Sequence, residues 1–180
     1  MLNTNIYLIS EQYVKQNSAL MQNVEKQFIE QHIIESQNLD MYEFLGKDLY
    51  DRVMSEWENF WLGSPGSPGT VVDPDIKTLT YDYIRPMLLY FTLYYSMYDF
   101  HMKHTNKGTN VQNSQNSVPA DIMMLEKQRK DYRNKGEVYA TRMLEYLNAN
   151  VDLFPEFQNI ADCETGAPSA YSNPWYLDDA

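Results

Sequence analysis

The chain has little cysteine and little positive charge, and each scarcity excludes a class of protein. Cys163 is the only cysteine among 180 residues, so no disulfide can form within the chain and the fold does not depend on oxidation. Folding inside a cell is the simple interpretation. Lys and Arg number 14 against 25 Asp and Glu, which gives a net charge of −11. This balance argues against a conventional nucleic-acid binder and against docking on an anionic membrane surface.

The chain also has no apolar run long enough to cross a membrane. The aromatic-rich stretch 86–98, between Arg85 and Asp99, is 13 residues long and begins with a proline, whereas a spanning helix needs about 20 apolar residues. It therefore predicts a helix that is buried on most of its circumference. The N-terminus has no basic segment followed by a long apolar run, so we expect no signal peptide.

The periodicity of apolar residues predicts an all-α fold, a bundle of about four helices. The first helix begins at Val24, with Asn23 as its N-cap. It either runs unbroken to Gly46 or breaks near Asn38, with Asp40 as a second cap. Gly46 suits a helix C-terminus or a tight kink.

The second and third helices are predicted on either side of a Gly-Ser-Pro loop. The second covers 47–62, with Phe60 and Trp61 in its apolar stripe. The loop that follows lacks the Gly-Lys-Ser/Thr of a phosphate-binding loop. The third helix covers about 76–104, and Pro86 should kink it or mark its effective start.

The fourth helix is predicted to be long, from Pro119 to about Asn148. It is preceded by the polar segment 104–118, where turn signals allow a short β-hairpin. At 1.5 Å per residue the helix measures about 45 Å, long enough to extend past its own core. Its narrow apolar stripe consists of Ile122, Leu125, Tyr132, Tyr139, Met143 and Tyr146.

Composition divides the chain into three parts: an N-terminal arm at 1–22 with one short apolar patch, a helical domain at 23–154, and an extended C-terminal arm at 155–180. The C-terminal arm is acidic, contains no Lys or Arg, and carries four aromatic residues. Free disordered tails are usually poor in aromatics, so we expect this arm to bind its own surface or another subunit. The candidate partner-binding residues are Phe157, Tyr171, Trp175 and Tyr176.

No catalytic or metal-binding pattern stands out, so we expect no enzyme, metal or cofactor. A metal site could use Asp99, His101 and His104, but no Glu-x-x-His pair exists, and histidines near a helix end are more often solvated or capping. Cys163 has no histidine nearby in sequence to act as a base. The tyrosines of the third helix could line a ligand cavity, although such a stripe is more often core.

One basic cluster stands out against the acidic background. The fourth helix carries five positive charges within nine positions. Either this is a solvated face relieved by Glu126 and Asp131, or it is an electrostatic dock for an acidic surface. The best candidate for that surface is the C-terminal arm of a neighbouring subunit, with DNA as a third alternative. The candidate inter-subunit residues are Lys127, Arg129, Lys130, Arg133 and Lys135.

Four segments in order resemble the head–tail connector (adaptor, or head-completion) proteins of tailed phages, closest to the version in crAss-like phages of Bacteroidetes. The first is VEKQFIEQHIIESQNLDMYEFLGKDLYDRV, followed by YDYIRPMLLYFTLYY, HTNKGTN and LFPEF. The resemblance covers about residues 24–160. The insertion at Gly63–Gly69 and the acidic tail have no counterpart in it.

The resemblance implies a mostly helical, non-enzymatic protein of the virion neck, assembled in the host cytoplasm. About twelve copies would form a ring that binds the portal protein on one side and the next neck or tail ring protein on the other. Double-stranded DNA would pass through without specific binding, since negative charge repels phosphate. Two alternatives remain. One is a non-viral helical adaptor or regulatory module that uses its C-terminal arm, and the other is a small helical metalloprotein or ligand-binding enzyme.

Overall fold

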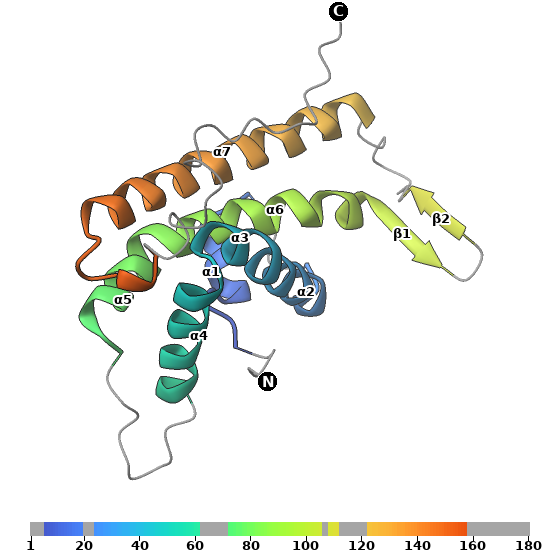
Figure 1. Ribbon diagram of the computed structural model, residues 1–180. Coiled ribbons are helices and arrows are strands. Elements are labelled where there is room, and N and C mark those ends of the chain that lie inside the picture. The colour runs from blue at the N-terminus through green and yellow to red at the C-terminus, as the bar shows by residue number, and fades with distance from the viewer. Residues whose placement is uncertain (1–5, 20–23, 62–71, 106–107, 112–121, 158–180) are drawn as a thin grey trace, which may run out of the picture.

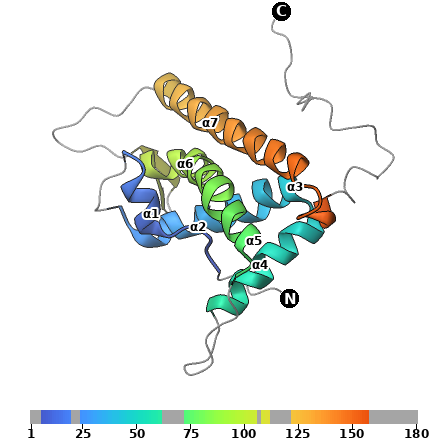
Figure 2. The ribbon, with the colours of Figure 1, turned by 90° about the vertical axis from the view of Figure 1, so that its left-hand side faces the viewer.

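The computed structural model describes residues 6–19, 24–61, 72–105, 108–111 and 122–157. In these residues the all-α class is confirmed: helices dominate, with one short hairpin beside them. Helix α6 (Arg85–His101) lies in the middle. Helix α7 (Ile122–Ala149) covers one side of it, and the N-terminal helices pack on the other side (Figures 1 and 2).

The N-terminal segment packs into the core of the molecule. Helix α1 (Glu11–Gln16) begins at Ser10, whose Oγ accepts a hydrogen bond from the backbone N–H of Tyr13 at 3.1 Å. Ile6, Leu8, Ile9 and Val14 are buried in the same core as the later helices. The described part of the predicted arm at 1–22 is therefore a structural element of the helical body.

A buried glutamine holds this segment in place. The Oε1 atom of Gln37 accepts a hydrogen bond from the backbone N–H of Leu8 at 2.8 Å, and its Nε2 donates to the carbonyl of Ile6 at 3.0 Å. Gln37 is 2 % exposed. Its amide thus satisfies two backbone groups that would otherwise be buried without partners.

The first predicted helix runs unbroken to Gly46, in three consecutive segments. These are α2 (Lys26–Ser36), the π-helical turn η1 (Gln37–Met41) and α3 (Tyr42–Leu45). The start predicted at Val24 was wrong by two residues, because Glu25 is still extended and serves as the N-cap. The predicted cap Asn23 lies outside the described residues. No break occurs at Asn38, because the π turn absorbs the irregularity without interrupting the helix.

Gly46 makes the sharp joint between α3 and helix α4 (Lys47–Trp61). Its backbone has φ 71° and ψ 168°, a conformation that residues with a Cβ rarely adopt. Helix α4 is described to Trp61, and the predicted last residue, Leu62, lies outside the described residues. Trp57 is buried and its Nε1 donates to Thr80 Oγ1 at 3.0 Å. Phe60 and Trp61 were predicted in the apolar stripe, but the last turn of α4 passes beyond the core and leaves them exposed.

The third predicted helix is also a succession of segments: α5 (Pro74–Thr78), the π turn η2 (Leu79–Ile84) and α6. At its end the prediction was wrong, because α6 stops at His101 instead of residue 104. The backbone N–H of Arg85 donates to the carbonyl of Thr80, five residues back. The helix therefore widens just before Pro86, which cannot donate a backbone hydrogen bond of its own.

A two-stranded antiparallel hairpin ends the third helix. Strand β1 (Met102–Thr105) follows α6 directly and pairs with β2 (Gly108–Val111). Extended backbone from residue 102 explains why the helix cannot reach 104. In Figure 1 the hairpin projects away from the helical body.

Helix α7 packs along α6 through aromatic pairs. Tyr90 of α6 stacks on Tyr139 at 5.5 Å between ring centroids, and Tyr83 of the preceding turn η2 stacks on Tyr146 at 4.4 Å. Leu125 and Met143 are buried as predicted. Ile122 was predicted in the same stripe but is 62 % exposed, because the first turn of α7 extends past the core. Pro119, the predicted first residue, lies outside the described residues.

Candidate functional site

The basic cluster of α7 divides into side chains held within the molecule and side chains that face solvent. Lys127, Lys130 and Lys135 are exposed, whereas Arg129 and Arg133 are half-buried. Arg133 forms an ion pair with Glu137 at 2.9 Å. The ammonium of Lys135 lies 5.6 Å from the ring centroid of Tyr90. Three of the five cations therefore face solvent, and the two arginines are held against the molecule.

Two arginines of the cluster contact one tyrosine of α6. The guanidinium of Arg129 lies 4.2 Å from the ring centroid of Tyr94, and that of Arg133 lies 5.8 Å from it. Such cation–π contacts fix the arginine side chains against α6. The pair of arginines thus helps to join α7 to α6, so reversing the charge of Arg133 would also disturb the fold.

Beside this tyrosine lies a carboxyl group that sequence analysis considered only as a helix cap. Asp40, in η1, accepts a hydrogen bond from the hydroxyl of Tyr95, the residue next to Tyr94. Its Oδ2 atom is buried without a hydrogen-bond partner among the described residues. Burial raises the pKa of Asp40 to about 7, although the hydrogen bond from Tyr95 opposes the rise. Burial, together with the nearby carboxylate of Asp40, raises the pKa of Tyr95.

The only sequence signal for this carboxyl was its position between Leu39 and Met41 in an apolar helical stretch. The π turn brings Asp40 under α6, and no local pattern predicts that turn. A half-buried carboxyl with a pKa near neutrality can change charge under ordinary conditions.

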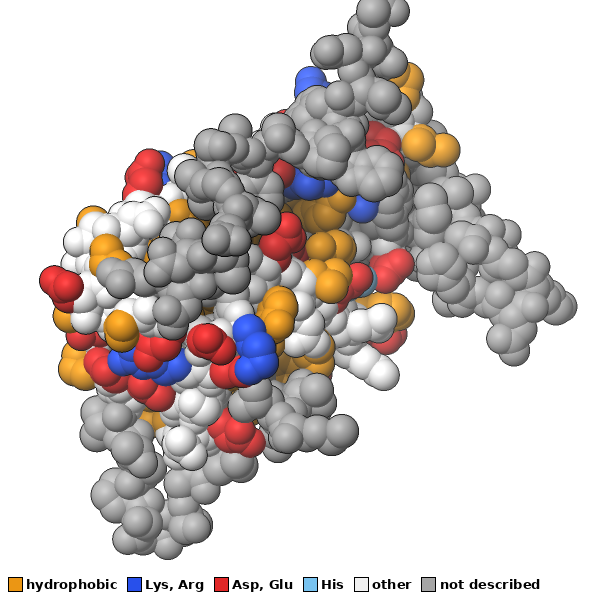
Figure 3. Space-filling model, viewed as in Figure 1, with side chains coloured by type: hydrophobic (Ala, Val, Ile, Leu, Met, Phe, Trp, Pro, Cys, Tyr) orange, Lys and Arg blue, Asp and Glu red, His pale blue; other side chains and the backbone are white. Residues whose placement is uncertain are grey.

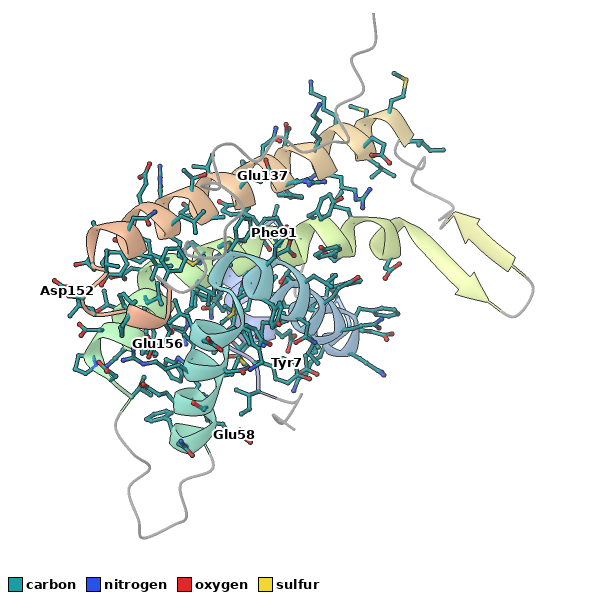
Figure 4. All side chains as sticks on the ribbon, viewed as in Figure 1. Tyr7, Glu58, Phe91, Glu137, Asp152 and Glu156 are labelled. Carbon is teal, nitrogen blue, oxygen red and sulfur yellow. The ribbon has the colours of Figure 1, made fainter. Side chains whose placement is uncertain are left out.

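The C-terminal arm begins as part of the helical body. Arg52 of α4 donates to Glu156 at 3.1 Å and to Asp73 at 3.0 Å, and it also reaches the carbonyl of Leu153 at 3.3 Å. Figure 4 labels Glu156 in the turn after α7, beside α4. Phe157 is partly buried against the chain's own core. Of the four candidate partner-binding residues, Phe157 thus packs on the chain itself.

The other three candidates, Tyr171, Trp175 and Tyr176, lie outside the described residues. Their role in binding a partner stays a prediction. What the structure adds is the position of the last described turn before them: Glu156 lies beside Arg52, which also pairs with Asp73 at the N-terminus of α5.

Sequence analysis considered Asp99 only as a ligand of a metal site that it did not expect, together with His101 and His104, whose side chains lie outside those that the structure describes. The carboxylate of Asp99 lies 2.9 Å from Nε2 of His32, and Nδ1 of His32 lies 2.9 Å from Glu35. His32 is 5 % exposed and joins α2 to the last turns of α6. Only one of these two contacts had a signal in the sequence: Glu35 follows His32 by three residues on a helix, a spacing that brings two side chains together. In the described part of the chain no group of three or more candidate ligands could hold a metal ion.

Two exposed apolar surfaces lie at opposite ends of the molecule. The methionine surface is the first turn of α7 and consists of Ile122, Met123 and Met124, which are 62, 78 and 69 % exposed. The aromatic surface is formed by Phe60 and Trp61 at the end of α4 with Tyr81 of η2, which are 45, 63 and 42 % exposed. Figure 3 shows hydrophobic side chains gathered at the end where α7 begins.

The comparisons with known proteins place this architecture in a family. The model of the Family of unknown function (DUF6712) matches residues 41–167. The chain belongs to the DUF6712 family. No curated protein and no solved structure matches it. No helix among the described residues is long and apolar enough to cross a membrane.

The DUF6712 match begins at the last residue of η1. It includes helices α3 to α7 and the basic cluster, and it leaves out α1 and α2. In this DUF6712 protein, Gln37 and His32 therefore belong to the part that precedes the match, while Asp99 and the core around α6 belong to the matched part.

Proposed function

We propose that this DUF6712 protein is a structural connector of a tailed-phage virion. It forms a ring below the portal, joins the capsid to the neck or tail, and extends the channel through which DNA passes. It has no catalytic role. Its place is the virion neck, after assembly in the host cytoplasm.

The observation that carries the proposal is the position of the connector-like segments in the fold. The first contains Gly46, the joint between α3 and α4, and the second contains Pro86, which follows the π turn into α6. The third contains the end of β1 and the beginning of β2, where Thr105 pairs with Gly108, and the fourth contains the buried Phe154 after α7. The resemblance therefore concerns residues that set the architecture, as expected for a protein whose function is its shape.

The proposed partners follow from the same resemblance. About twelve copies associate in a closed ring with heterologous contacts, so that one face of a copy meets a different face of the next. The ring binds the portal protein and the next neck or tail ring protein. A net charge of −11 supports a channel that repels phosphate and lets double-stranded DNA slide without specific binding.

The C-terminal arm from residue 158 onward is the proposed link to a neighbour or to the portal, in an extended conformation. Trp175 and Tyr176 are its expected anchors, with Tyr171 beside them, since buried aromatics dominate interface energetics. Phe157 packs on the chain's own core, so it marks where the arm begins. Lys127 and Lys130, which are exposed, are the best candidates in the basic cluster for receiving an acidic arm.

Native mass spectrometry of the purified chain across a concentration series tests the assembly. A closed, metal-free ring near twelve copies supports the connector. Bound metal would instead favour the metalloprotein alternative. If the purified chain is a metal-free monomer, the next test is made on purified virions. Mass spectrometry should detect the protein there, and labelling should locate it at the neck. Its absence from virions would overturn the proposal in favour of a non-viral adaptor.

Removal of residues 158–180 tests the arm separately. The truncated chain should keep its helical content, because Arg52, Glu156 and Phe157 remain in place, but it should bind the portal or a neighbouring copy more weakly. The charge reversal Lys130→Glu is the matching test of the basic cluster, and Arg142→Glu on an exposed later turn of α7 is its control. Equal assembly of the two charge variants would refute an electrostatic dock at Lys130.

A further inference from the structure

We propose that the methionine surface of one copy docks on the aromatic surface of the next copy. This inference rests on the proposed function, because it assigns the contact by which the subunits associate. It concerns two described surfaces and involves neither the C-terminal arm nor the hairpin.

The first argument is the placement of the two surfaces along the molecule. The methionine surface starts α7, whereas the other end of α7 lies beside η2 through the stacked pair Tyr146 and Tyr83. Tyr83 is two residues from Tyr81 of the aromatic surface. At 1.5 Å per residue, Ile122 and Tyr146 are about 36 Å apart along the helix. Figures 1 and 2 both show the start of α7 and the end of α4 at opposite ends of the molecule.

This placement decides the symmetry of the contact. A surface at one end cannot meet the different surface at the other end of its own chain. It can meet that surface on a second copy, which then offers its own free end to a third. Contacts of this heterologous kind generate rings when the rotation closes.

The second argument is chemical complementarity. Two adjacent methionines form a flexible, polarisable surface, and thioethers make favourable contacts with aromatic rings. The aromatic surface is rigid by comparison. Phe60 packs edge-on against the buried Trp57 at 5.6 Å, and the guanidinium of Arg85 lies 3.7 Å from the centroid of Tyr81. An adaptable surface on a fixed aromatic one allows close packing, and an exposed tryptophan such as Trp61 is a typical interface anchor.

The third argument is the charge around each surface. The two turns after the methionine surface carry three cations, Lys127, Arg129 and Lys130, against two acids, Glu126 and Asp131, so this end has a small positive charge. The end that carries the aromatic surface is acidic, because Arg52 is already shared among Glu56, Asp73 and Glu156. Further carboxylates there are Glu58, Asp75 and Asp82, against the cations Lys77 and Arg85. Opposite charge at the rims favours a second copy as the occupant and steers the two ends together.

Two variants and their mixture test this contact. Ile122→Asp/Met124→Asp removes the methionine surface, and Trp61→Asp removes the aromatic one. Each variant alone should be monomeric in native mass spectrometry and sedimentation, at concentrations at least ten-fold above those at which the wild type assembles. Mixed in equal amounts they should form a heterodimer and nothing larger, because each supplies the surface that the other lacks.

Val138→Asp is the matched control. Val138 is an exposed apolar residue of α7 outside both surfaces, so this variant should assemble like the wild type. Circular dichroism checks that each chain is folded. If an Asp variant loses helicity, Met124→Ser and Trp61→Ser replace the pair. A wild type that stays monomeric, variants that assemble normally, or a mixture without heterodimer would each overturn the contact.

The proposed contact and the proposed connector function can fail independently of each other. Assembly through these two surfaces by a protein that is absent from purified virions would support the contact and refute the connector. A protein that is present at the virion neck, and whose assembly survives both substitutions, would support the connector and refute the contact.

Discussion

Gly136 of α7 lies directly against the ring of Phe91 in α6: a Cβ atom at position 136 would lie 3.1 Å from two of the ring carbons and 3.2 Å from a third. Phe91 is 3 % exposed and its ring lies 6.1 Å from that of Phe44. Figure 4 labels Phe91 between α6 and α7. The ring therefore has little room to move away, and the close approach of the two helices depends on the absence of a side chain.

Gly136→Ala should destabilise the fold, although Ala favours a helix over Gly by about 1 kcal/mol. The methyl group would meet the face of a ring that is packed on its other side, and we expect a net loss of about 1–2 kcal/mol. Thermal and urea unfolding measure the change. The control Asn134→Ala, on an exposed position of the same helix, should be neutral or slightly stabilising. A more stable Gly136→Ala variant would show that the two helices can separate easily.

Asp40→Asn should stabilise the protein at neutral pH and flatten its pH dependence. The folded pKa of Asp40 is raised from 3.8 to about 7 by burial. Between these values the folded state binds more protons than the unfolded state, so the free energy of unfolding of the wild type falls as pH rises through this range. Asn cannot ionise, yet its Oδ1 can still accept from Tyr95.

The expected gain of Asp40→Asn is roughly 1–3 kcal/mol at pH 8, after allowance for partial solvent access, and close to zero near pH 4. Urea unfolding at several pH values measures it. Asp131→Asn, at an exposed position of α7, is the control and should leave the profile unchanged. Parallel profiles for wild type and Asp40→Asn would contradict the assignment of this titration to Asp40.

Gln37→Leu should release the N-terminal segment from the core. It would leave the N–H of Leu8 and the carbonyl of Ile6 buried without their partner, at a cost of about 1–3 kcal/mol. Hydrogen exchange should rise first in residues 6–16. The exposed Gln31→Leu on α2 is the control. Unchanged protection in that segment would mean that apolar burial alone holds it.

Gly46→Ala should weaken the joint between α3 and α4. At φ 71° and ψ 168° a Cβ is strained, and such a conformation costs about 1–3 kcal/mol for a residue other than glycine. Unfolding measurements test the loss, and ring assembly by native mass spectrometry tests whether the direction of α4 changes. Lys47→Ala, on the exposed next residue, should have little effect. Wild-type stability of Gly46→Ala would show that the joint can relax.

Much of the fold followed from local spacing. The helix boundary at Gly46, the second helix from Lys47, and the buried faces of Leu125 and Met143 were all predicted from periodicity and from the conformational freedom of glycine. Errors gathered where a helix passes the edge of the core. Ile122 and Trp61 continue apolar stripes, but no second layer from the described residues buries them. A sequence pattern carries no information on where its partner surface ends.

The residues of the candidate site were less predictable. The basic cluster was visible in the sequence, but the contacts of Arg129 and Arg133 with Tyr94 depend on how α7 lies on α6. Asp99 was considered with its neighbours in sequence, whereas its partner His32 is 67 positions away. Pairing over such distances is decided by packing, because the energy of a buried charged group depends on every element that surrounds it.

The sequence by itself determined the helical class, the charge balance and the joint at Gly46, since periodicity, composition and the allowed backbone angles of glycine are local properties. Only the tertiary structure decided that residues 6–16 enter the core, that Asp40 is half-buried against α6 with its Oδ2 atom enclosed, and that two apolar surfaces are exposed at opposite ends of the described part of the chain. The physical reason is that a local pattern states which face of a helix avoids water, while burial also requires a second surface, supplied by residues far away in the chain.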